Sequence, residues 1–445
     1  MPLRDTLQKV EVVRLPFRVL EFDEDGLIAI DRNFKEIETK LSQLQSYMNN
    51  VGFNVIAGGG GDAILLSGLD AQKPSSGHGL EGKVFYWATD TRKLYAMLDS
   101  DVLEPAIEVF TAADFDNIRN NLEGNYILRA DIDLSGYANW QPIGTATYNP
   151  YEPDFEKAVN LTNAFKGRLN GNGHKITGLT INNENEEIFI GLFGAIHNAE
   201  FINIALEDIS ITASSCERTG GLVGWCGGGL IADSYVTGNI EGKHGIGLIT
   251  GGTHFGTQIT QCYTAGEVKG RISVGGLAGS IDSAGYLQRS FSNANVESNS
   301  GPVGGLVGSG AGRILDCYAT GTVTGNGWTG GLRGYNSRDD ESEVDGGNIR
   351  RCFAVGAVSN NTPNRLGGLV GGTPTGGSYS DRGNFWDTET SGTEQSAMGE
   401  GKTTAQMKDK ETFDEAGYRF ESSITPTWGI DGVTNNGYPY LLWNG

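Results

Sequence analysis

The sequence predicts an all-β protein whose main part is a parallel β-helix, preceded by a coiled coil and a small β module. Three observations carry this prediction. Glycine accounts for 68 of the 445 residues, which is roughly twice its usual share. A Gly-Leu motif recurs seven times at a spacing near 28 residues, and an aromatic motif recurs between its copies. Such periods are typical of solenoids, because one repeat cannot bury its apolar face alone whereas stacked repeats can.

The first 26 residues contain the run Leu-Pro-Phe-Arg-Val-Leu-Glu-Phe-Asp at positions 15–23, and Ile-Asp-Arg-Asn-Phe follows at 30–34. This order resembles the virion-proximal segment of phage tail fibres. The resemblance implies that residues 1–26 attach the chain to other virion tail proteins. The start of the chain shows no apolar stretch followed by a small-residue cleavage site, so no secretory signal is expected.

Residues 27–52 carry a strict heptad pattern. Apolar side chains follow one another at alternating steps of three and four residues, at Leu27, Ile30, Phe34, Ile37, Leu41, Leu44, Met48 and Val51. So narrow a seam favours a self-associating coiled coil over a helix packed on its own domain, which would bury a wider stripe. Isoleucine and leucine mixed over both seam positions, with a large phenylalanine, favour three strands over two. The first predicted partner is therefore the chain itself, as a homotrimer.

Residues 53–107 are predicted to form a hinge and a small β-hairpin module. The run Gly58-Gly59-Gly60-Gly61 is typical of a flexible joint, and no Gly-Lys-Ser/Thr follows it as a phosphate loop requires. Residues 79–95 are expected to form two strands around an Asp-Thr turn. This stretch resembles a short module of phage tail fibres and tailspikes, with Lys83 where that module usually has arginine.

Residues 108–390 hold the repeats and are predicted to form the β-helix with its entry cap. The Gly-Leu copies start at Gly191, Gly221, Gly247, Gly276, Gly305, Gly331 and Gly368. The aromatic motif places a cysteine or serine directly before an aromatic residue, and its copies are Ser234-Tyr235, Cys262-Tyr263, Ser290-Phe291, Cys317-Tyr318 and Cys352-Phe353. Equivalent residues are expected to stack about 4.8 Å apart along the axis. Glycine and asparagine are expected at the sharp corners, where they permit a left-handed backbone.

The cysteines of the aromatic motif are expected to point inward and to stay free, as small apolar side chains. Serine fills the same position in neighbouring repeats, which argues against a redox or metal role. Five cysteines with no CxxC pair imply neither a disulfide framework nor a cysteine zinc site.

The Gly-Gly-Leu-Val-Gly pattern resembles the GLUG repeat of bacterial and phage surface proteins. The approach segment, with Trp140-Gln141-Pro142-Ile143-Gly144 and Phe165-Lys166-Gly167, and the ending Asn436-Gly437-Tyr438-Pro439-Tyr440-Leu441 are similar to that family as well. The resemblance covers about residues 108–445 and implies a right-handed β-helix. It implies no single activity.

Residues 391–445 lie beyond the repeats and are predicted to form a C-terminal cap. Thr403 or Thr404 is expected to begin a short helix. The aromatic residues between Trp428 and Trp443 are expected to form a plug, because a solenoid end exposes unpaired strand edges that need cover.

Composition limits the function. A net charge of −21 argues against a nucleic-acid or anionic-membrane partner. No apolar run is long enough for a membrane helix. No HExxH or GxSxG motif occurs. The aligned residues at Glu267 and at Asp233 and Asp316 form no adjacent carboxylate pair of the kind that cleaves glycans. No catalytic residue and no cofactor are predicted.

Two insertions are candidate receptor contacts. The stretch 146–155 contributes Tyr148, Tyr151 and Phe155, an aromatic density that suits sugar stacking or a subunit contact. The stretch 337–347 contributes Asp339, Asp340 and Glu341, and it is interpreted as a solvated acidic loop or a calcium site.

Taken together, these patterns favour a phage tail fibre or tailspike located in the virion tail, binding a host surface glycan or protein through several weak contacts. The alternatives are a polysaccharide-degrading tailspike, a head fibre and a bacterial adhesin.

Overall fold

The chain divides into two units, Met1–Pro105 and Ala106–Gly445. In the first unit, the computed structural model describes only the backbone of four strands. In the second unit, it describes residues 106–149, 159–185, 188–337, 349–362, 365–374, 383–420 and 427–444. The predicted attachment segment 1–26 and the predicted coiled coil 27–52, with all its seam residues, lie outside the described residues.

The first unit contains a four-stranded mixed sheet. Its strands are β1 (Asn54–Ala57), β2 (Ile64–Gly68), β3 (Val84–Ala88) and β4 (Lys93–Met97). β1 runs antiparallel to β2, β2 runs parallel to β3, and β3 runs antiparallel to β4. β3 lies within the stretch 79–95 for which the sequence predicts two strands, and β4 begins in that stretch and ends two residues beyond it. β1 and β2 had no counterpart in the prediction.

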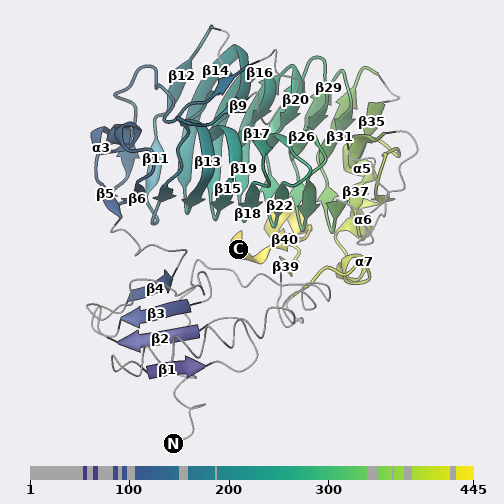
Figure 1. The fold of residues 1–445 in the computed structure, drawn as a ribbon. Helices are drawn as coiled ribbons and strands as arrows, with labels where there is room; N and C mark the ends of the chain where they lie inside the picture. The colour runs from purple at the N-terminus through teal and green to yellow at the C-terminus, as the bar shows by residue number, and fades with distance from the viewer. Residues whose placement is uncertain are drawn as a thin grey trace, which may run out of the picture. The chain divides into compact units, whose positions relative to one another are not determined.

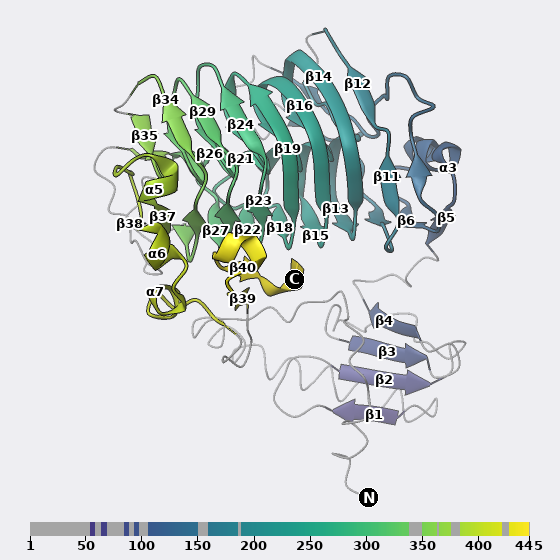
Figure 2. The ribbon, with the colours of Figure 1, turned by 180° about the vertical axis from the view of Figure 1, so that it is seen from behind.

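The second unit is a parallel β-solenoid of the right-handed type with about seven turns, so the all-β solenoid prediction is confirmed. Figures 1 and 2 show its turns side by side, from α3 at one end to α5 at the other. Fourteen strands form the first of its sheets. They are β5 (Ile107–Val109), β6 (Asn125–Leu128), β10 (Arg168–Asn170), β13 (Phe193–Ile202), β15 (Val223–Ala232), β17 (Thr250–His254), β18 (Gln258–Thr260), β21 (Ala278–Ile281), β22 (Tyr286–Gln288), β26 (Val307–Gly310), β27 (Arg313–Leu315), β31 (Arg333–Asn336), β32 (Ile349–Arg350) and β36 (Val370–Gly372).

The second sheet of the solenoid alternates with the first along the chain. Its strands are β7 (Ile132–Asp133), β11 (Lys175–Thr177), β12 (Thr180–Asn182), β14 (Ala205–Gly220), β16 (Tyr235–Gly247), β19 (Tyr263–Gly270), β20 (Ile272–Gly275), β23 (Phe291–Ser292), β24 (Asn295–Ser298), β25 (Val303–Gly304), β28 (Tyr318–Ala319), β29 (Val323–Gly325), β30 (Thr329–Gly330), β33 (Phe353–Ala354), β34 (Val358–Asn360), β35 (Leu366–Gly367), β37 (Phe385–Asp387) and β38 (Glu400–Lys402). The turns β22–β26, β27–β31 and β32–β36 repeat the same five-strand order.

The leucines of the Gly-Leu motif form one column inside the solenoid. The amide of Leu277 donates to Leu306, that of Leu306 to Leu332, and that of Leu332 to Leu369, at 2.8–2.9 Å. All four side chains are fully buried. The motif therefore marks the same point on successive turns, as its period predicts.

The glycines of this motif serve a different purpose from the one expected. None of the described motif glycines from Gly276 to Gly368 has a positive φ. A Cβ placed on Gly305 would instead lie 2.2 Å from the carbonyl oxygen of Gly331. These glycines are needed because neighbouring turns approach closely.

The left-handed corners lie elsewhere in the repeat, one residue before the inward cysteine or serine. The residues there have φ between 47° and 51° and are Asp233, Gln261, Arg289, Asp316 and Arg351. The next residue points inward, so Cys262, Cys317 and Cys352 are free and buried, and Ser234 and Ser290 are buried beside them. The predicted inward column is therefore present. Burial also raises the pKa of the Cys226 thiol, to about 12.

The N-terminal end of the solenoid is closed by α3 (Ala112–Asp116) and the short helix η2 (Asn117–Asn120). Thr111 begins α3 with a capping box that includes Asp114. Phe115 and Trp140 are buried there with ring centroids 6.0 Å apart. An antiparallel pair, β8 (Thr147–Tyr148) and β9 (Val159–Asn160), follows on the outer surface.

The C-terminal end is closed by residues 388–402. α5 (Thr388–Ser391) follows β37, and β38 then pairs with β37 in parallel. The hydroxyl of Ser396 accepts from the amides of Leu369 and Val370, which belong to the last turn. The strand pairing of the solenoid thus continues past residue 390, where the repeats end.

Candidate binding groove

The C-terminal segment, defined as residues 403–444, lies along the side of the solenoid and does not plug its end. It comprises α6 (Thr404–Met407), α7 (Lys410–Asp414), β39 (Trp428–Gly429), η4 (Thr434–Gly437), β40 (Tyr440–Leu441) and η5 (Leu442–Asn444). Figures 1 and 2 show β39 and β40 beside β22 and β27. The aromatic plug expected at the solenoid end is therefore placed on a flank.

The surface under this segment is an outward column of aromatic rings. Tyr235, Tyr263, Phe291, Tyr318 and Phe353 occupy equivalent positions on successive turns. Neighbouring rings are nearly parallel, with centroids 4.7–5.2 Å apart. Phe291, Tyr318 and Phe353 are buried in one cluster with residues of the C-terminal segment. This apolar stack explains why the segment docks here.

Two buried carboxylates hold the segment in place. Asp387 accepts hydrogen bonds from the Tyr438 hydroxyl at 2.8 Å and the Thr404 hydroxyl at 2.7 Å. Asp316 accepts from the indole N–H of Trp428 at 3.2 Å. Asp316 also makes a two-pronged ion pair with Arg351, at 2.6 and 2.7 Å. Burial disfavours the charge on Arg351, but the hydrogen bond and charge of Asp316 outweigh burial and raise its pKa.

A groove of about 630 Å³ lies between the segment and the solenoid. Its solenoid wall is a second outward column, which consists of Asn293, Thr320 and Val355. Each of these residues directly follows an inward residue that pairs with its equivalent on the neighbouring turn. The Thr320 hydroxyl donates to the side-chain oxygen of Asn293 at 2.7 Å. The opposite wall consists of Thr390, Lys408, Val433, Asn435, Asn436 and Tyr438.

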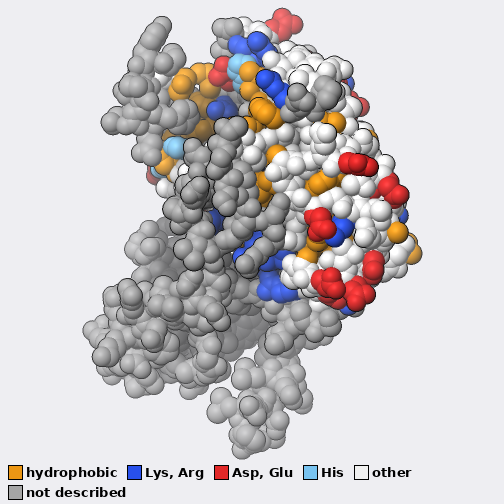
Figure 3. Space-filling view, turned by 90° about the vertical axis from the view of Figure 1, so that its right-hand side faces the viewer, with side chains coloured by type: hydrophobic (Ala, Val, Ile, Leu, Met, Phe, Trp, Pro, Cys, Tyr) orange, Lys and Arg blue, Asp and Glu red, His pale blue; other side chains and the backbone are white. Residues whose placement is uncertain are grey.

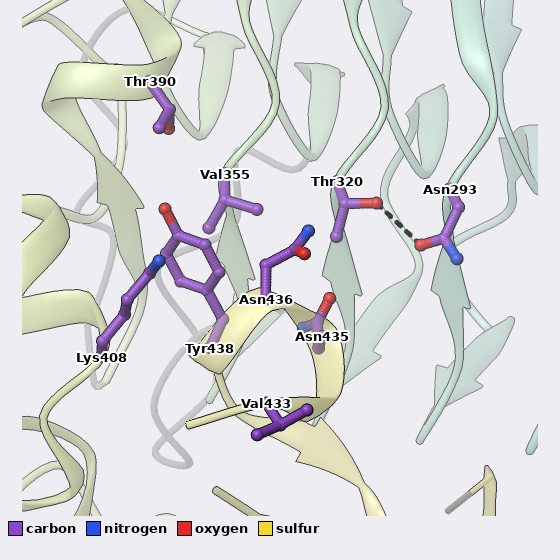
Figure 4. Close-up of a pocket in the computed structure, with 9 residues that line it drawn as sticks. All are labelled: Asn293, Thr320, Val355, Thr390, Lys408, Val433, Asn435, Asn436 and Tyr438. Atoms are coloured by element: carbon purple, nitrogen blue, oxygen red, sulfur yellow. Dashed lines mark hydrogen bonds between the residues drawn. The ribbon is translucent and has the colours of Figure 1, made fainter. Parts of the chain in front are cut away.

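Asn436 projects toward the solenoid wall, and its neighbour Asn435 donates its side-chain amide to the carbonyl of Pro439 at 2.8 Å. Asn435 and Asn436 both have left-handed backbones, with φ of 50° and 55°. Figure 4 shows the Asn436 side chain between Val355 and Thr320, with Lys408 beside the Tyr438 ring. The Lys408 ammonium lies 4.7 Å from the centroid of that ring. Asn436 and Lys408 are exposed, so both amide and ammonium are accessible to a ligand.

The groove lining consists mainly of neutral polar groups. Its lining residues offer three amides, two hydroxyls, one phenol and one ammonium, and none of them is a carboxylate, histidine or cysteine. The phenol of Tyr438 is already committed to Asp387. Amides and hydroxyls both donate and accept, which suits a ligand rich in hydroxyl groups.

A second groove, of about 410 Å³, carries charges of both signs. Glu241, Lys269 and Glu297 are equivalent residues on three successive turns. The sequence prediction found no carboxylate column at Glu267, and Glu267 indeed pairs with Asn239 and Asn295. It missed the Glu241–Lys269–Glu297 column, in which a lysine separates the two carboxylates. The hydrogen bond and charge of the exposed Glu267 raise the pKa of Lys269.

Of the predicted contact residues, the structure describes only Tyr148, and Tyr148 does not line the groove. Tyr148 lies on β8 and packs against the buried cluster that contains Trp225. Tyr151, Phe155, Asp339, Asp340 and Glu341 lie outside the described residues. The groove residues escaped sequence reasoning because Asn293, Thr320 and Val355 occupy a variable position of the aromatic motif, two residues after the aromatic ring, and differ in type. The only local signal was the pair Asn435-Asn436 before a glycine.

Within the described ranges, no helix is long and apolar enough to cross a membrane. The same ranges contain no group of three or more histidine, cysteine or acidic residues arranged to hold a metal ion. On the described part of the face seen in Figure 3, apolar side chains occur mostly in small groups between polar ones.

Comparison with known proteins identifies the GLUG motif in residues 299–324. A protein of Evansella cellulosilytica described as a Gly-rich membrane protein is 30% identical over 407 residues, covering 74% of this chain and 44% of the relative. Halomucin of Haloquadratum walsbyi is 30% identical over 71% of this chain and 3% of its own length. An immunoglobulin A1 protease of Streptococcus pneumoniae is 31% identical over 29% of this chain and 8% of its own length. The chain thus spans less than half the length of these curated relatives.

Among solved structures, a Bacteroides ovatus protein assigned as an immunoglobulin A1 protease matches with a TM-score of 0.43 and 19% identity, covering 78% of this chain and 93% of that one. An IgA1 protease structure matches with a TM-score of 0.38 and 15% identity, over 68% of this chain and 23% of the other.

The expectation of a phage tail fibre or tailspike is wrong. The curated relatives named above are described as a membrane protein, a halomucin and an immunoglobulin A1 protease, and none of them as a virion protein. The short N-terminal runs that suggested a fibre cover few residues and carry little weight against a match over 74% of the chain. The predicted homotrimer stays a prediction, because its seam lies outside the described residues.

Proposed function

We propose that this chain supplies a rigid, non-catalytic module to a secreted or cell-surface protein, and that the module binds carbohydrate in the groove beside the C-terminal segment. The observation that carries the proposal is the groove lining. It presents amides and hydroxyls from two rigid walls and no acid–base pair. Ligand sites typically combine such fixed polar groups with a preformed cavity.

The relatives support the location. One relative is described as a membrane protein and another as a halomucin, which fits a place at the cell surface, and both align over more than 70% of this chain. A module of stacked turns suits such a protein. Each turn contacts only its neighbours, and the stack therefore holds exposed side chains at a fixed spacing.

A glycan panel tests the binding. The panel contains neutral and uronic-acid oligosaccharides, and the whole chain is applied to it. We expect binding that Asn436→Ala and Asn293→Ala each weaken about tenfold, the loss of roughly one good hydrogen bond. Asn185→Ala is the matched control, since Asn185 is an exposed asparagine that does not line the groove. Equal binding by all three variants, or no binding by the parent chain, would refute the proposal.

Lys408→Gln tests the charge preference of the groove. Because Lys408 is the one charged residue in the lining, its replacement is expected to weaken the binding of uronic-acid oligosaccharides more than the binding of neutral ones.

Antibody labelling tests the location separately. Antibodies raised against residues 106–445 are expected to label intact cells of the producing organism. Labelling that requires permeabilised cells would contradict a surface location and leave the binding result standing.

A further inference from the structure

The solenoid surface has a second unusual feature, an exposed phenylalanine with a strained backbone. This residue does not line the groove. Phe255 follows β17 and has a φ of +57°. Its side chain is 41% exposed. A left-handed backbone costs a bulky residue free energy, and exposure of its ring brings no compensating burial. Strain of this kind concentrates at functional sites.

The equivalent positions on neighbouring turns show how unusual Phe255 is. Strand register aligns His197 with Gly227 and Gly227 with His254, so the following residues Asn198, Gly228 and Phe255 share one column. All three have positive φ, at 51°, 89° and 57°. Asparagine and glycine are the residues that tolerate this conformation. A phenylalanine at this position lowers the stability of the fold, so folding does not explain its presence.

The loop that carries Phe255 is held rigidly. Asp282, from the next turn, accepts from the Thr253 hydroxyl at 2.7 Å and from the Gly256 amide at 3.3 Å. The buried Thr257 hydroxyl lies within hydrogen-bonding distance of the carbonyls of His254 and Cys226, which share its one hydrogen, and it accepts from the Gly228 amide. These bonds fix the backbone on both sides of Phe255, so the ring is presented in one position.

Imidazole and amide groups surround the ring. The His254 ring lies 4.2 Å from the Phe255 ring, centroid to centroid, and the His197 ring lies 6.4 Å away and nearly perpendicular. The exposed Asn198 side chain lies 3.5 Å from the Nε2 atom of His197. The ring of the buried Trp225 lies 6.2 Å from the His254 ring, centroid to centroid. The exposed phenylalanine ring thus adjoins hydrogen-bonding side chains.

We infer that Phe255, with His197 and Asn198, forms a second carbohydrate subsite that takes a single neutral pyranose ring. The C–H face of a pyranose is weakly positive and stacks on the negative face of an aromatic ring, while its hydroxyls pair with the amide and imidazole. A protein partner fits less well, because a typical protein interface buries about 800 Å² on each side around an apolar centre. The other large apolar residues exposed in the described ranges are Ile107, Phe110 and Val433, and none of them is near Phe255 in the chain.

This inference rests on the proposed carbohydrate-binding function, and a site-specific readout separates the two. The whole chain is labelled with 5-fluorotryptophan, and the Trp225 signal is assigned with Trp225→Phe. Trp225 reports on the Phe255 subsite, whereas Trp428 and Trp443 report on the C-terminal segment. The probes are methyl glycosides of glucose, galactose, mannose and N-acetylglucosamine.

We expect at least one probe to shift the Trp225 fluorine signal in a saturable way. Phe255→Asn should abolish that shift without lowering the midpoint of thermal unfolding, because asparagine accepts the left-handed backbone. Asn198→Ala should weaken the binding severalfold, and Phe110→Ala, which alters another exposed phenylalanine, should leave it unchanged.

No Trp225 shift with any probe, or a shift that persists in Phe255→Asn, would overturn the subsite. If the probes shift the Trp225 signal but the groove variants Asn436→Ala and Asn293→Ala bind the glycan panel as the parent chain does, the subsite stands and the groove proposal fails. A lowered unfolding midpoint in Phe255→Asn would show that the ring serves packing and would also count against the inference.

Discussion

Arg333 is a buried cation in an interior that consists mostly of apolar side chains. It occupies the variable position of its Gly-Leu motif, and strand register aligns it with Val307 and Val370 on the turns either side. Its guanidinium is fully buried and donates to the side chain of Asn336 at 3.1 Å and to the carbonyl of Gly312 at 2.8 Å. Burial lowers its pKa, which reflects the cost of a buried charge that has no carboxylate partner among the described residues.

Replacing Arg333 should therefore not weaken the fold. Arg333→Met keeps a long side chain and removes the buried charge, so we expect the free energy of unfolding to rise by about 1–3 kcal/mol. Urea unfolding of the two proteins measures the difference. Arg313→Met, which alters an exposed arginine at the edge of β27, serves as the control and should change little. A clear loss of stability in Arg333→Met would mean that its hydrogen bonds outweigh its desolvation.

The C-terminal segment depends on a small number of polar contacts to keep its place. Asp387 is fully buried and ends the outward column that forms the groove wall, one turn past Val355. It caps α5 through the amides of Glu389 and Thr390 and also receives the hydroxyls of Thr404 and Tyr438. One carboxylate therefore links the end of the solenoid, α6 and the groove.

The Tyr438 contact gives a pH dependence with a definite sign. Burial, aided by the hydrogen bond to Asp387, raises the pKa of Tyr438 to about 12 from 10.0. A group with a raised folded-state pKa contributes its full stabilisation at pH values below its unfolded-state pKa. That stabilisation is lost as the pH rises through the folded-state pKa. We expect the parent chain to lose more stability than Tyr438→Phe between pH 10 and pH 12.

At pH 7, Tyr438→Phe is expected to cost about 1.5–3 kcal/mol, because a buried carboxylate loses a donor. Urea unfolding across this pH range measures both effects. The other buried tyrosines are present in both proteins, so the difference isolates Tyr438. Parallel curves for the two proteins from pH 9 to pH 12 would contradict the assignment.

The motif glycines set the spacing between turns. A Cβ on Gly331 would lie 2.2 Å from the carbonyl oxygen of Gly368 and 2.8 Å from the Ala354 side chain. Gly331→Ala is therefore expected to destabilise the solenoid by about 1–3 kcal/mol through overpacking. Gly136→Ala is the matched control, because a Cβ there meets nothing within 4 Å. Thermal unfolding of both variants tests the point, and equal midpoints would exclude close packing as the reason for the motif.

The sequence predicts those elements that repeat. The leucine column and the inward cysteines follow from equal spacing, because equal steps along the chain become equal positions on successive turns. The role of the motif glycines could not be predicted, since close approach and a left-handed backbone both favour glycine. The corner itself is occupied by residues such as Arg289 and Gln261, which carry no turn signal.

The groove could not be predicted because one of its walls does not repeat. Tyr438 and Asp387 are 51 residues apart, and no period relates them. Trp428 and Asp316 are 112 residues apart, yet they meet because the segment returns along the solenoid. Phe255 was equally hidden, since only the strand register reveals that its neighbours in the column are asparagine and glycine.

At the scale of the whole solenoid, stability comes from contacts between adjacent turns. Each turn pairs with the turn before it and the turn after it, as β26 does with β21 and β31. In such a stack the free energy is approximately a sum of turn and interface terms. A complete turn is thus the smallest piece that can be removed without breaking the register.

Excision of residues 277–305 tests this directly. The deletion removes 29 residues, since Leu277 and Leu306 are equivalent on adjacent turns, and joins Gly276 to Leu306. Because Val274 pairs with Val303 and Ala278 with Val307, the new junction repeats a native one. We expect the shortened chain to fold with a β-rich circular dichroism spectrum and a cooperative transition at a lower midpoint. Excision of residues 277–291, about half a turn, is the control and is expected to abolish that transition, because it would place outward side chains in the core. If both deletions behave alike, the stacking of equivalent turns is not what holds the molecule together.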